Sequence, residues 1–168
     1  MANEIINRIE KSPIVQIDLE DYYTAGPRKS IDIKDWLYME LILREKDFRE
    51  MIKLHDWTQY ENCFVSIYCS ADAIIPQWAS MLIASALEPY AKMTNFGDSE
   101  QMEILLYEDA FRYFNFDELK GKPVIIKGCG NLPVPTHAYL SFTQKAQAFA
   151  KSIMYGEACS TVPVYKRK

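Results

Sequence analysis

Apolar and polar residues alternate in two short segments near the start of the chain. Residues 15–19 place an apolar side chain at every second position, and residues 31–33 repeat this pattern after a loop that contains Gly26 and Pro27. A period of two predicts strands with one buried face. Residues 48–55 instead carry apolar side chains on one helical face and charged side chains on the other, which predicts an amphipathic helix.

Strands and helices alternate in the rest of the chain. Asp98 and Gln101 have the spacing of a capping box, which predicts that a helix begins there. Pro163 lies in a short apolar run near the end, and proline within a strand is tolerated at the edge of a sheet. The predicted strands are residues 64–69, 92–96, 124–127 and 162–165, and the predicted helices are residues 75–90, 102–113 and 139–149.

This order of elements predicts an α/β fold. Residues 62–151 read strand, helix, strand, helix, strand, helix, and such units form a parallel sheet through right-handed crossovers. We expect a mostly parallel, three-layer-like arrangement of sheet and helices, in which the two N-terminal strands extend the sheet or lie antiparallel to it. No long polar linker interrupts the chain, so residues 1–168 are expected to form a single α/β domain.

Composition and charge exclude several classes of protein. Of the 168 residues, 49% are hydrophobic and 25% are charged, which is typical of a globular protein. A formal net charge of −4 lacks the basic character of nucleic-acid-binding proteins, so we expect no nucleic-acid partner. The N-terminus has no apolar signal region, and the longest nearly apolar stretch, residues 73–87, is too short and polar to cross a membrane. A soluble cytoplasmic protein is therefore expected.

Two junctions between a strand and a helix resemble each other. Each leaves an apolar strand at a cysteine, Cys69 or Cys129, and enters a helix at a proline, Pro76 or Pro135, with an alanine three residues later. Proline is favoured in the first helical turn, where its missing N–H has no intrahelical partner. Cys159 begins a weaker third copy of the pattern with no helix after it.

These three cysteines predict a site for a soft metal. The carboxyl ends of parallel strands share one edge of a sheet, and neighbouring strands about 4.8 Å apart would bring Cys69 and Cys129 within reach of one ion. Cys159 joins them only if the chain crosses back after the last helix. Thiolates select zinc, copper(I) and iron–sulfur centres. The alternative is that the cysteines are structural and fill small apolar gaps.

His137 and Asp72 complete the candidate ligand set. His137 lies near the start of the helix after Cys129 and could serve as a ligand or base, or be a surface residue of the first helical turn. Asp72 could bind the metal, orient a water or cap the following helix. The metal-site prediction therefore comprises Cys69, Cys129, Cys159, His137 and Asp72, with zinc or an iron–sulfur cluster as the cofactor.

Other polar residues favour structural interpretations. Cys63 precedes Cys69 by six residues on one strand, about 20 Å away, so it cannot share a metal with it and is expected to pack in the core. His55 lies at the end of a predicted helix, where a cation-capable ring suits the dipole. Lys127 could lower a thiol pKa if it reaches the same edge. A solvated surface, rather than a hard-cation site, is the favoured explanation for Asp18, Glu20, Asp21, Asp32 and Asp35.

Four stretches of the chain carry a family resemblance. They are residues 32–50 (DIKDWLYMELILREKDFRE), 69–79 (CSADAIIPQWA), 124–135 (VIIKGCGNLPVP) and 151–168 (KSIMYGEACSTVPVYKRK). They resemble an uncharacterised bacterial family, domain of unknown function 2480, essentially from end to end. The family has no established activity. Its members often lie beside genes of the sulfur-mobilising iron–sulfur cluster assembly system, which implies a role in handling iron, sulfide or a cluster, with iron–sulfur assembly proteins as partners.

Three functions follow as hypotheses. The first is an accessory factor whose cysteines bind a soft metal or an iron–sulfur cluster. The second is a metal-free adaptor or homodimer that acts through an aromatic surface, since three tryptophans and 11 tyrosines exceed the needs of a small core. The third is a thiol enzyme with Cys129 or Cys69 as nucleophile and His137 as base. The zincin, dinucleotide, P-loop and serine-hydrolase motifs are absent from the sequence, and whether the protein is an enzyme stays open.

Overall fold

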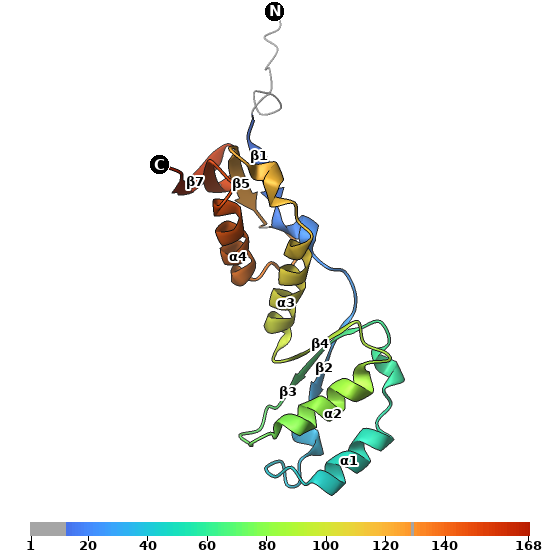
Figure 1. Cartoon of the computed structure of the whole chain (residues 1–168). Coiled ribbons are helices and arrows are strands. Elements are labelled where there is room, and N and C mark those ends of the chain that lie inside the picture. Colours follow the sequence, from blue (N-terminus) through green and yellow to red (C-terminus); the bar gives the residue numbers. More distant parts are fainter. Residues whose placement is uncertain (1–12, 129) are drawn as a thin grey trace, which may run out of the picture. The chain divides into compact units, whose positions relative to one another are not determined.

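The chain divides into two compact units. The computed structural model describes residues 13–128 and 130–168 (Figure 1). Unit 1 combines the described part of Met1–Thr24 with Ile104–Lys168, and unit 2 is Ala25–Glu103, which lies between these segments in the sequence. Division into compact units does not measure whether they unfold together, so the single domain expected from the sequence stays a prediction.

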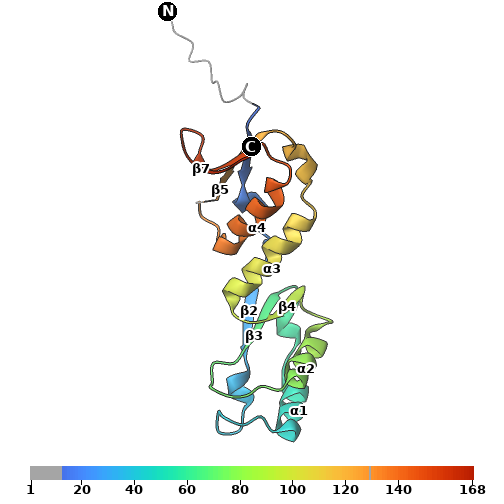
Figure 2. The same cartoon turned by 60° about the vertical axis from the view of Figure 1, so that its left-hand side comes forward.

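Unit 2 is a three-stranded parallel sheet with two helices. Strands β2, β3 and β4 lie in that order, so both crossovers run in the same direction and place their helices on one face of the sheet. Helices α1 and α2 lie side by side (Figures 1 and 2). The elements of unit 2 are β2 (Arg28–Asp32), the 3₁₀ helix η2 (Ile33–Trp36), α1 (Glu45–Leu54), η3 (Thr58–Tyr60), β3 (Phe64–Tyr68), α2 (Gln77–Leu87) and β4 (Met93–Phe96).

Unit 1 has the same order of elements and one additional strand. Strands β1, β5 and β6 are parallel neighbours, and β7 pairs antiparallel with β6 as the second strand of a hairpin. Helix α3 (Ser99–Arg112) crosses the boundary between the units in the sequence. The other elements of unit 1 are β1 (Val15–Asp18), η1 (Leu19–Tyr22), η4 (Phe116–Leu119), β5 (Pro123–Lys127), α4 (Thr136–Gln147), β6 (Ser152–Glu157) and β7 (Ser160–Lys166).

The structure confirms the α/β class with mostly parallel sheets, and it corrects the number of sheets. Both N-terminal strands extend a sheet in parallel, β1 beside β5 and β2 beside β3. The strands predicted to share one sheet are divided, with β3 and β4 in one sheet and β5 in the other. The reason is that each N-terminal strand pairs with a different later strand. Strand β6 was not expected, because residues 152–157 have only a short apolar run, Ile153–Tyr155, and no alternation of apolar and polar positions.

The two units repeat one architecture. A shift of 59 residues takes the first residues of β3, α2 and β4 to those of β5, α4 and β6, namely 64 to 123, 77 to 136 and 93 to 152. Backbone hydrogen bonds follow the same shift: Asn62 N–H donates to the Tyr90 carbonyl at 2.9 Å, and Gly121 N–H donates to the Phe149 carbonyl at 3.0 Å. Asn62 and Gly121 both have positive φ, 59° and 69°, which asparagine and glycine tolerate best. Unit 1 is therefore the same fold as unit 2, with different side chains.

The N-terminal strands of both units end in the same way. Asp18 ends β1 and accepts a hydrogen bond from the Glu20 N–H at 3.1 Å, and Asp32 ends β2 and accepts one from the Lys34 N–H at 3.0 Å. Each aspartate thereby caps a 3₁₀ helix whose first residue is fully buried. These two carboxylates have a local structural role beyond lying on a solvated surface.

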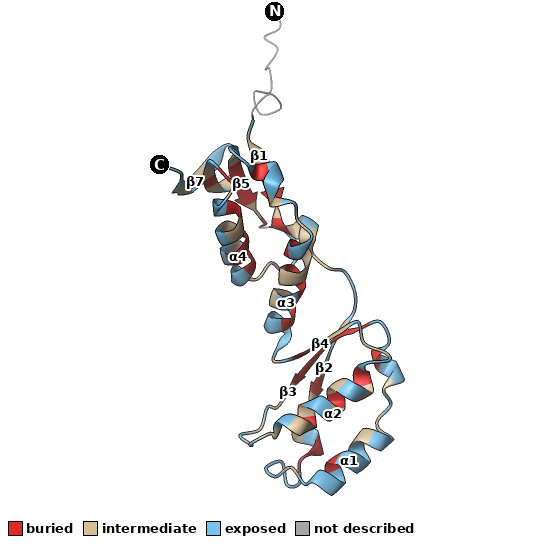
Figure 3. Ribbon diagram, in the orientation of Figure 1, coloured by how far each residue is buried: buried red, intermediate tan, exposed pale blue. Residues whose placement is uncertain are grey.

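Each unit buries a core of its own. Figure 3 shows that buried residues concentrate on the central strands and the inward faces of the helices. The helices α2 and α4 contribute matched residues, because Ile83 and Phe142 are related by the 59-residue shift and both are fully buried. In the described part of the chain, every helix is too short or too polar to cross a lipid bilayer.

Candidate functional site

An apolar groove lies beside α4 in unit 1. Its volume is about 550 Å³, within the range of small-molecule pockets. None of its lining residues is charged. Helix α4 and its first turn contribute Thr136, Tyr139, Leu140, Thr143 and Gln144, and the strands contribute Ile126, Ile153, Met154, Tyr155 and Val164.

The groove exists because the β6–β7 hairpin widens the sheet without adding a helix. Helix α4 covers the sheet with its buried residues, Phe142 among them, and leaves the outer strands open beside it. Leu140 is 59% exposed, Tyr155 is 38% exposed and Val164 is 54% exposed. Contiguous exposed apolar side chains of this kind mark interaction surfaces.

A tyrosine fixes one end of the groove. The Tyr139 hydroxyl donates a hydrogen bond of 2.7 Å to the Gly128 carbonyl, and its ring meets Tyr155 edge to face with centroids 5.8 Å apart. A Cβ atom at position 128 would lie 2.7 Å from that hydroxyl, so the close approach requires glycine. The end of β5 is thereby tied to α4.

Unit 2 has a smaller slot at the equivalent place. Its volume is about 190 Å³. Ser80 and Ala84 replace Tyr139 and Thr143 of the groove, so the helix side of the slot is built from smaller side chains. No described strand lies beyond β4 to close the slot as β7 closes the groove. The slot residues are Ile67, Ser80, Met81, Ala84, Thr94, Asn95 and Phe96, and each becomes a groove residue after the 59-residue shift.

The predicted metal ligands are distributed over the two units. Cys69 and Asp72 belong to unit 2, Cys159 and His137 belong to unit 1, and Cys129 lies outside the described residues. The Cys69 thiol is partly exposed and donates to the Ala71 carbonyl at 3.6 Å. Cys159 is exposed in the turn between β6 and β7. Among the residues that the structure describes, no group of three or more His, Cys, Asp and Glu side chains is arranged to hold a metal.

The geometric premise for the metal site is wrong. Cys69 and Cys129 follow β3 and β5, which belong to different sheets rather than to neighbouring strands. The 59-residue shift also pairs Cys69 with Gly128 and Ser70 with Cys129, so the cysteines hold different positions in the two similar junctions. The metal site itself stays a prediction. Burial of Cys63, which is 3% exposed, agrees with its expected packing role.

Asp72 does not cap the following helix. It is exposed, and Pro76 occupies the capping position of α2 with no side-chain hydrogen bond. The corresponding position before α4 is Pro135, with nearly the same backbone conformation. Proline at the start of both helices agrees with the pattern seen in the sequence.

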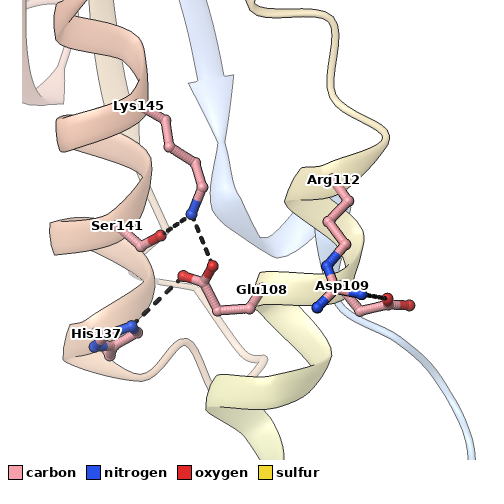
Figure 4. A network of polar contacts seen from close by, with 6 residues as sticks. All are labelled: Glu108, Asp109, Arg112, His137, Ser141 and Lys145. Atoms are coloured by element: carbon pink, nitrogen blue, oxygen red, sulfur yellow. Dashed lines mark hydrogen bonds and ion pairs between the residues drawn. The ribbon is translucent and has the colours of Figure 1, made fainter.

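His137 belongs to a polar network that joins α3 to α4 (Figure 4). Its Nε2 lies 3.5 Å from Glu108, and Lys145 donates to the other oxygen of Glu108 at 2.7 Å. Ser141 lies between them and accepts a hydrogen bond from Lys145. Burial raises the pKa of Glu108, but hydrogen bonds from Lys145 and Ser141, together with the positive charge of Lys145, outweigh this effect and lower that pKa below its ordinary value. This network holds two helices together within unit 1.

His55 has the structural role that its position predicts, but not as a cation. Its Nε2 shares a hydrogen bond of 2.9 Å with the Tyr60 hydroxyl, and its ring packs against Trp36 and Trp57. Burial lowers the pKa of His55, although Asp56 opposes this effect. The neutral ring therefore suits an aromatic cluster better than it suits a helix dipole.

Two charged residues at the strand ends are fully engaged. The Lys127 ammonium group lies 3.3 Å from Asp18 and 3.9 Å from Glu157. Its hydrogen bond to Asp18 raises the pKa of Lys127, and the negative charge of Glu157 raises it further. Its side chain serves carboxylates rather than a thiol. In unit 2, burial raises the pKa of Asp32, but hydrogen bonds from Ser70 and Lys34 hold it below its ordinary value.

Sequence reasoning did not identify the groove. Its residues have helical and strand spacing that is typical of core positions, and they stay exposed because no helix of the described residues covers β6 and β7. The one signal in the sequence was the excess of tyrosine and tryptophan, which indicated a partner surface without placing it.

Comparison with known proteins agrees with the family resemblance seen in the sequence. Neither the curated proteins nor the solved structures gave a match. A family model with the description "Protein of unknown function (DUF2480)" matches residues 3–167, which is nearly the whole chain. The chain therefore belongs to the DUF2480 family, whose function is unknown.

Proposed function

We propose that this protein is a metal-free adaptor that binds an apolar helix of a partner protein in the groove of unit 1. The observation that carries the proposal is the uncharged groove of about 550 Å³ beside α4. Its exposed lining includes Leu140, Tyr155 and Val164, which would otherwise stay in contact with water. Burying such side chains is worth roughly 25 cal/mol per Å² of apolar surface.

A helix is the expected occupant because helices form the layer that covers a sheet in an α/β unit. In an α/β unit, helices cover the apolar face of the sheet, and neighbouring helices pack with axes about 8–10 Å apart. Helix α4 covers one side of this face, and no helix in residues 13–128 and 130–168 follows β6 or β7. An amphipathic helix with apolar residues at helical spacing would occupy the vacant position beside α4.

Site-specific photo-crosslinking tests the proposal. Full-length protein carrying p-benzoylphenylalanine at position 140 is incubated with cell extract, and crosslinked segments are read by mass spectrometry. We expect segments with apolar residues at helical spacing, and loss of the crosslinks on Tyr155→Lys. The matched control carries the photoprobe at position 81, which the 59-residue shift relates to position 140. Only crosslinks to proteins other than this chain are compared, and such crosslinks no stronger than at position 81, or segments without helical spacing, would contradict the proposal.

A second proposal is the role predicted from the cysteines, an accessory factor that binds zinc or an iron–sulfur cluster for cluster-assembly proteins. The exposed position of Cys159 in a hairpin turn favours it, because such a thiol is accessible to a metal and to a partner's ligand. We expect anaerobically purified protein to contain zinc or iron, and Cys69→Ser and Cys159→Ser to lose it. Cys63→Ser is the matched control and should keep the metal, since Cys63 is buried. Metal content that is absent, or equal in all variants, would contradict this proposal.

The thiol-enzyme hypothesis is tested by comparing the wild type with a His137→Gln variant. If Cys69 or Cys129 is an activated nucleophile, iodoacetamide at neutral pH should modify it much faster than free cysteine. His137, its predicted base, is paired with Glu108, so a His137→Gln variant should slow the modification only if the enzyme hypothesis is correct. Equal rates of modification in the wild type and in His137→Gln would contradict the thiol-enzyme hypothesis.

A further inference from the structure

We propose that β4 is the contact between two copies of this chain, which pair antiparallel through their β4 strands. The two repeats differ most at this strand. In unit 1 the equivalent strand β6 is covered by β7, whereas the sheet of unit 2 ends at β4 in the described part of the chain. The two repeats take different paths directly after a pair of equivalent glycines, Gly97 in unit 2 and Gly156 in unit 1, which the 59-residue shift relates.

That divergence has a local cause. Both glycines have positive φ, 146° and 119°, and an acidic residue follows each of them. After Gly156 the chain turns back as β7, but Asp98 instead caps α3, where it accepts from the Gln101 N–H at 2.9 Å. In unit 2 the segment after Gly97 therefore forms helix α3, whereas the equivalent segment of unit 1 forms the strand that covers β6.

The other edge strands of the described chain, β1, β2 and β7, each carry a charged residue or proline, which β4 lacks, and in β1 this residue is Asp18. Strand β7 contains Pro163 and Lys166, and β2 begins with Arg28 and Lys29, and proline and cations on an edge discourage pairing with another chain. The four residues of β4, Met93–Phe96, include neither charge nor proline. An edge strand without charge or proline is expected where the strand pairs with another chain.

Helix α2 supports an interface at the same place. Residues 77–87 contain no charged side chain, and such a helix is typically buried on all sides. Yet Met81 is 67% exposed, and Phe96 at the end of β4 is 58% exposed. Both line the slot of unit 2, beside the small residues Ser80 and Ala84. A second copy would cover this apolar surface.

A second copy fits because the strand is complementary to itself. The Gly97 N–H donates to the Ile67 carbonyl of β3, and the register places Asn95 opposite Ser66. Alternation therefore directs the backbone groups of Asn95 toward β3 and those of Thr94 and Phe96 outward. A two-fold axis at Asn95 lets Thr94 of each protomer exchange both backbone hydrogen bonds with Phe96 of the other, and it keeps the helices of both copies on one face. The same register places Lys92 of one protomer opposite Asp98 of the other, so opposite charges meet at both ends.

This register makes a specific covalent prediction. Thr94 of one protomer and Phe96 of the other form a hydrogen-bonded pair, with Cα atoms about 5.5 Å apart, which a disulfide can span. The test uses full-length protein in which Cys69, Cys129 and Cys159 are replaced by serine. We expect the Thr94→Cys/Phe96→Cys double variant to form a reducible dimer under mild oxidation, and each single variant to form much less.

Sedimentation equilibrium of the native full-length chain gives an independent readout. We expect a dimer that Met81→Glu or Phe96→Lys converts to monomer. Leu140→Glu and Tyr155→Lys are the matched controls at the equivalent positions of unit 1 and should leave the dimer intact, as measured together with circular dichroism to verify folding. A monomeric wild type, a dimer unaffected by the unit 2 variants, or crosslinking of the double variant no faster than the single variants would overturn the proposal. These outcomes are separate from those of the groove, since the groove is tested by crosslinks to other proteins and the dimer by association of this chain with itself.

Discussion

The two units of this protein show how one architecture is adapted by what surrounds it. Both have three parallel strands and two crossover helices, and their second crossovers share the same turn hydrogen bonds at a shift of 59 residues. Unit 1 adds a hairpin strand, enlarges the slot beside its second helix into a groove, and ties its helices together with charges. Unit 2 keeps a small slot, an aromatic cluster around His55 and an unprotected edge strand. Function is expected where the copies differ, because shared features maintain the fold.

The largest expected effect tests whether the units unfold together. Ile83 and Phe142 are equivalent core residues, and truncating either to alanine should cost about 3 kcal/mol. All three tryptophans lie in unit 2, so tryptophan fluorescence during urea unfolding reports on that unit. For the single domain predicted from the sequence, Phe142→Ala should shift the fluorescence transition as far as Ile83→Ala does. A fluorescence midpoint unchanged by Phe142→Ala would show that the units unfold separately.

An intermediate effect concerns the two strand-end aspartates. Asp32 accepts hydrogen bonds from Lys34 and Ser70, whereas Asp18 accepts one from Glu20 and is paired with Lys127 at the surface. We expect Asp32→Asn to cost about 1–2 kcal/mol and Asp18→Asn to cost less. Chemical denaturation at neutral pH measures both.

The free energy of unfolding at low pH tests the role of Asp32 independently. Because the pKa of Asp32 is lowered in the folded state, its contribution is present above the unfolded pKa and is lost as pH falls through the folded value. The difference between wild type and Asp32→Asn should therefore shrink in acid. A difference that stays constant with pH would show that the substitution acts through packing instead.

The smallest expected effect replaces His55 with its counterpart in unit 1, Phe114. Burial lowers the pKa of His55, so the unfolded chain binds a proton more readily than the folded protein does. Stability should therefore fall as pH decreases below about 6.5, the ordinary value for histidine. In the His55→Phe variant this part of the pH dependence should be absent, as measured by thermal unfolding between roughly pH 7 and 5. An unchanged pH profile would assign the dependence to another group.

Local features of the fold could be predicted from the sequence because they depend on neighbouring residues. Alternation at residues 15–19, the continuous apolar run at residues 124–127 and the capping pair at Asp98 and Gln101 each correspond to an observed element. The burial of Cys63 followed from the length of a strand. In each case the interaction partners are a few residues away, or the period of the element alone decides which side chains are buried.

Pairing between distant strands could not be predicted in the same way. Parallel strands of similar composition offer the same hydrogen bonds, so nothing local to β3 or β5 indicates which N-terminal strand will join it. That choice separated Cys69 and His137 into different units and removed the premise of the cysteine site. The similarity of the two cysteine junctions was real, but it reflected a repeat in which the cysteines are one position out of register.

The amino-acid order by itself determined the α/β class, the positions of most helices and strands, and the family to which the chain belongs. Tertiary structure alone decided that the strands form two repeated sheets, which apolar side chains stay in contact with water, and which strands of the described residues lie at the sheet edges. The physical reason is that periodicity records whether a side chain is suited to burial, whereas the surface that buries it is supplied by segments far away in the chain.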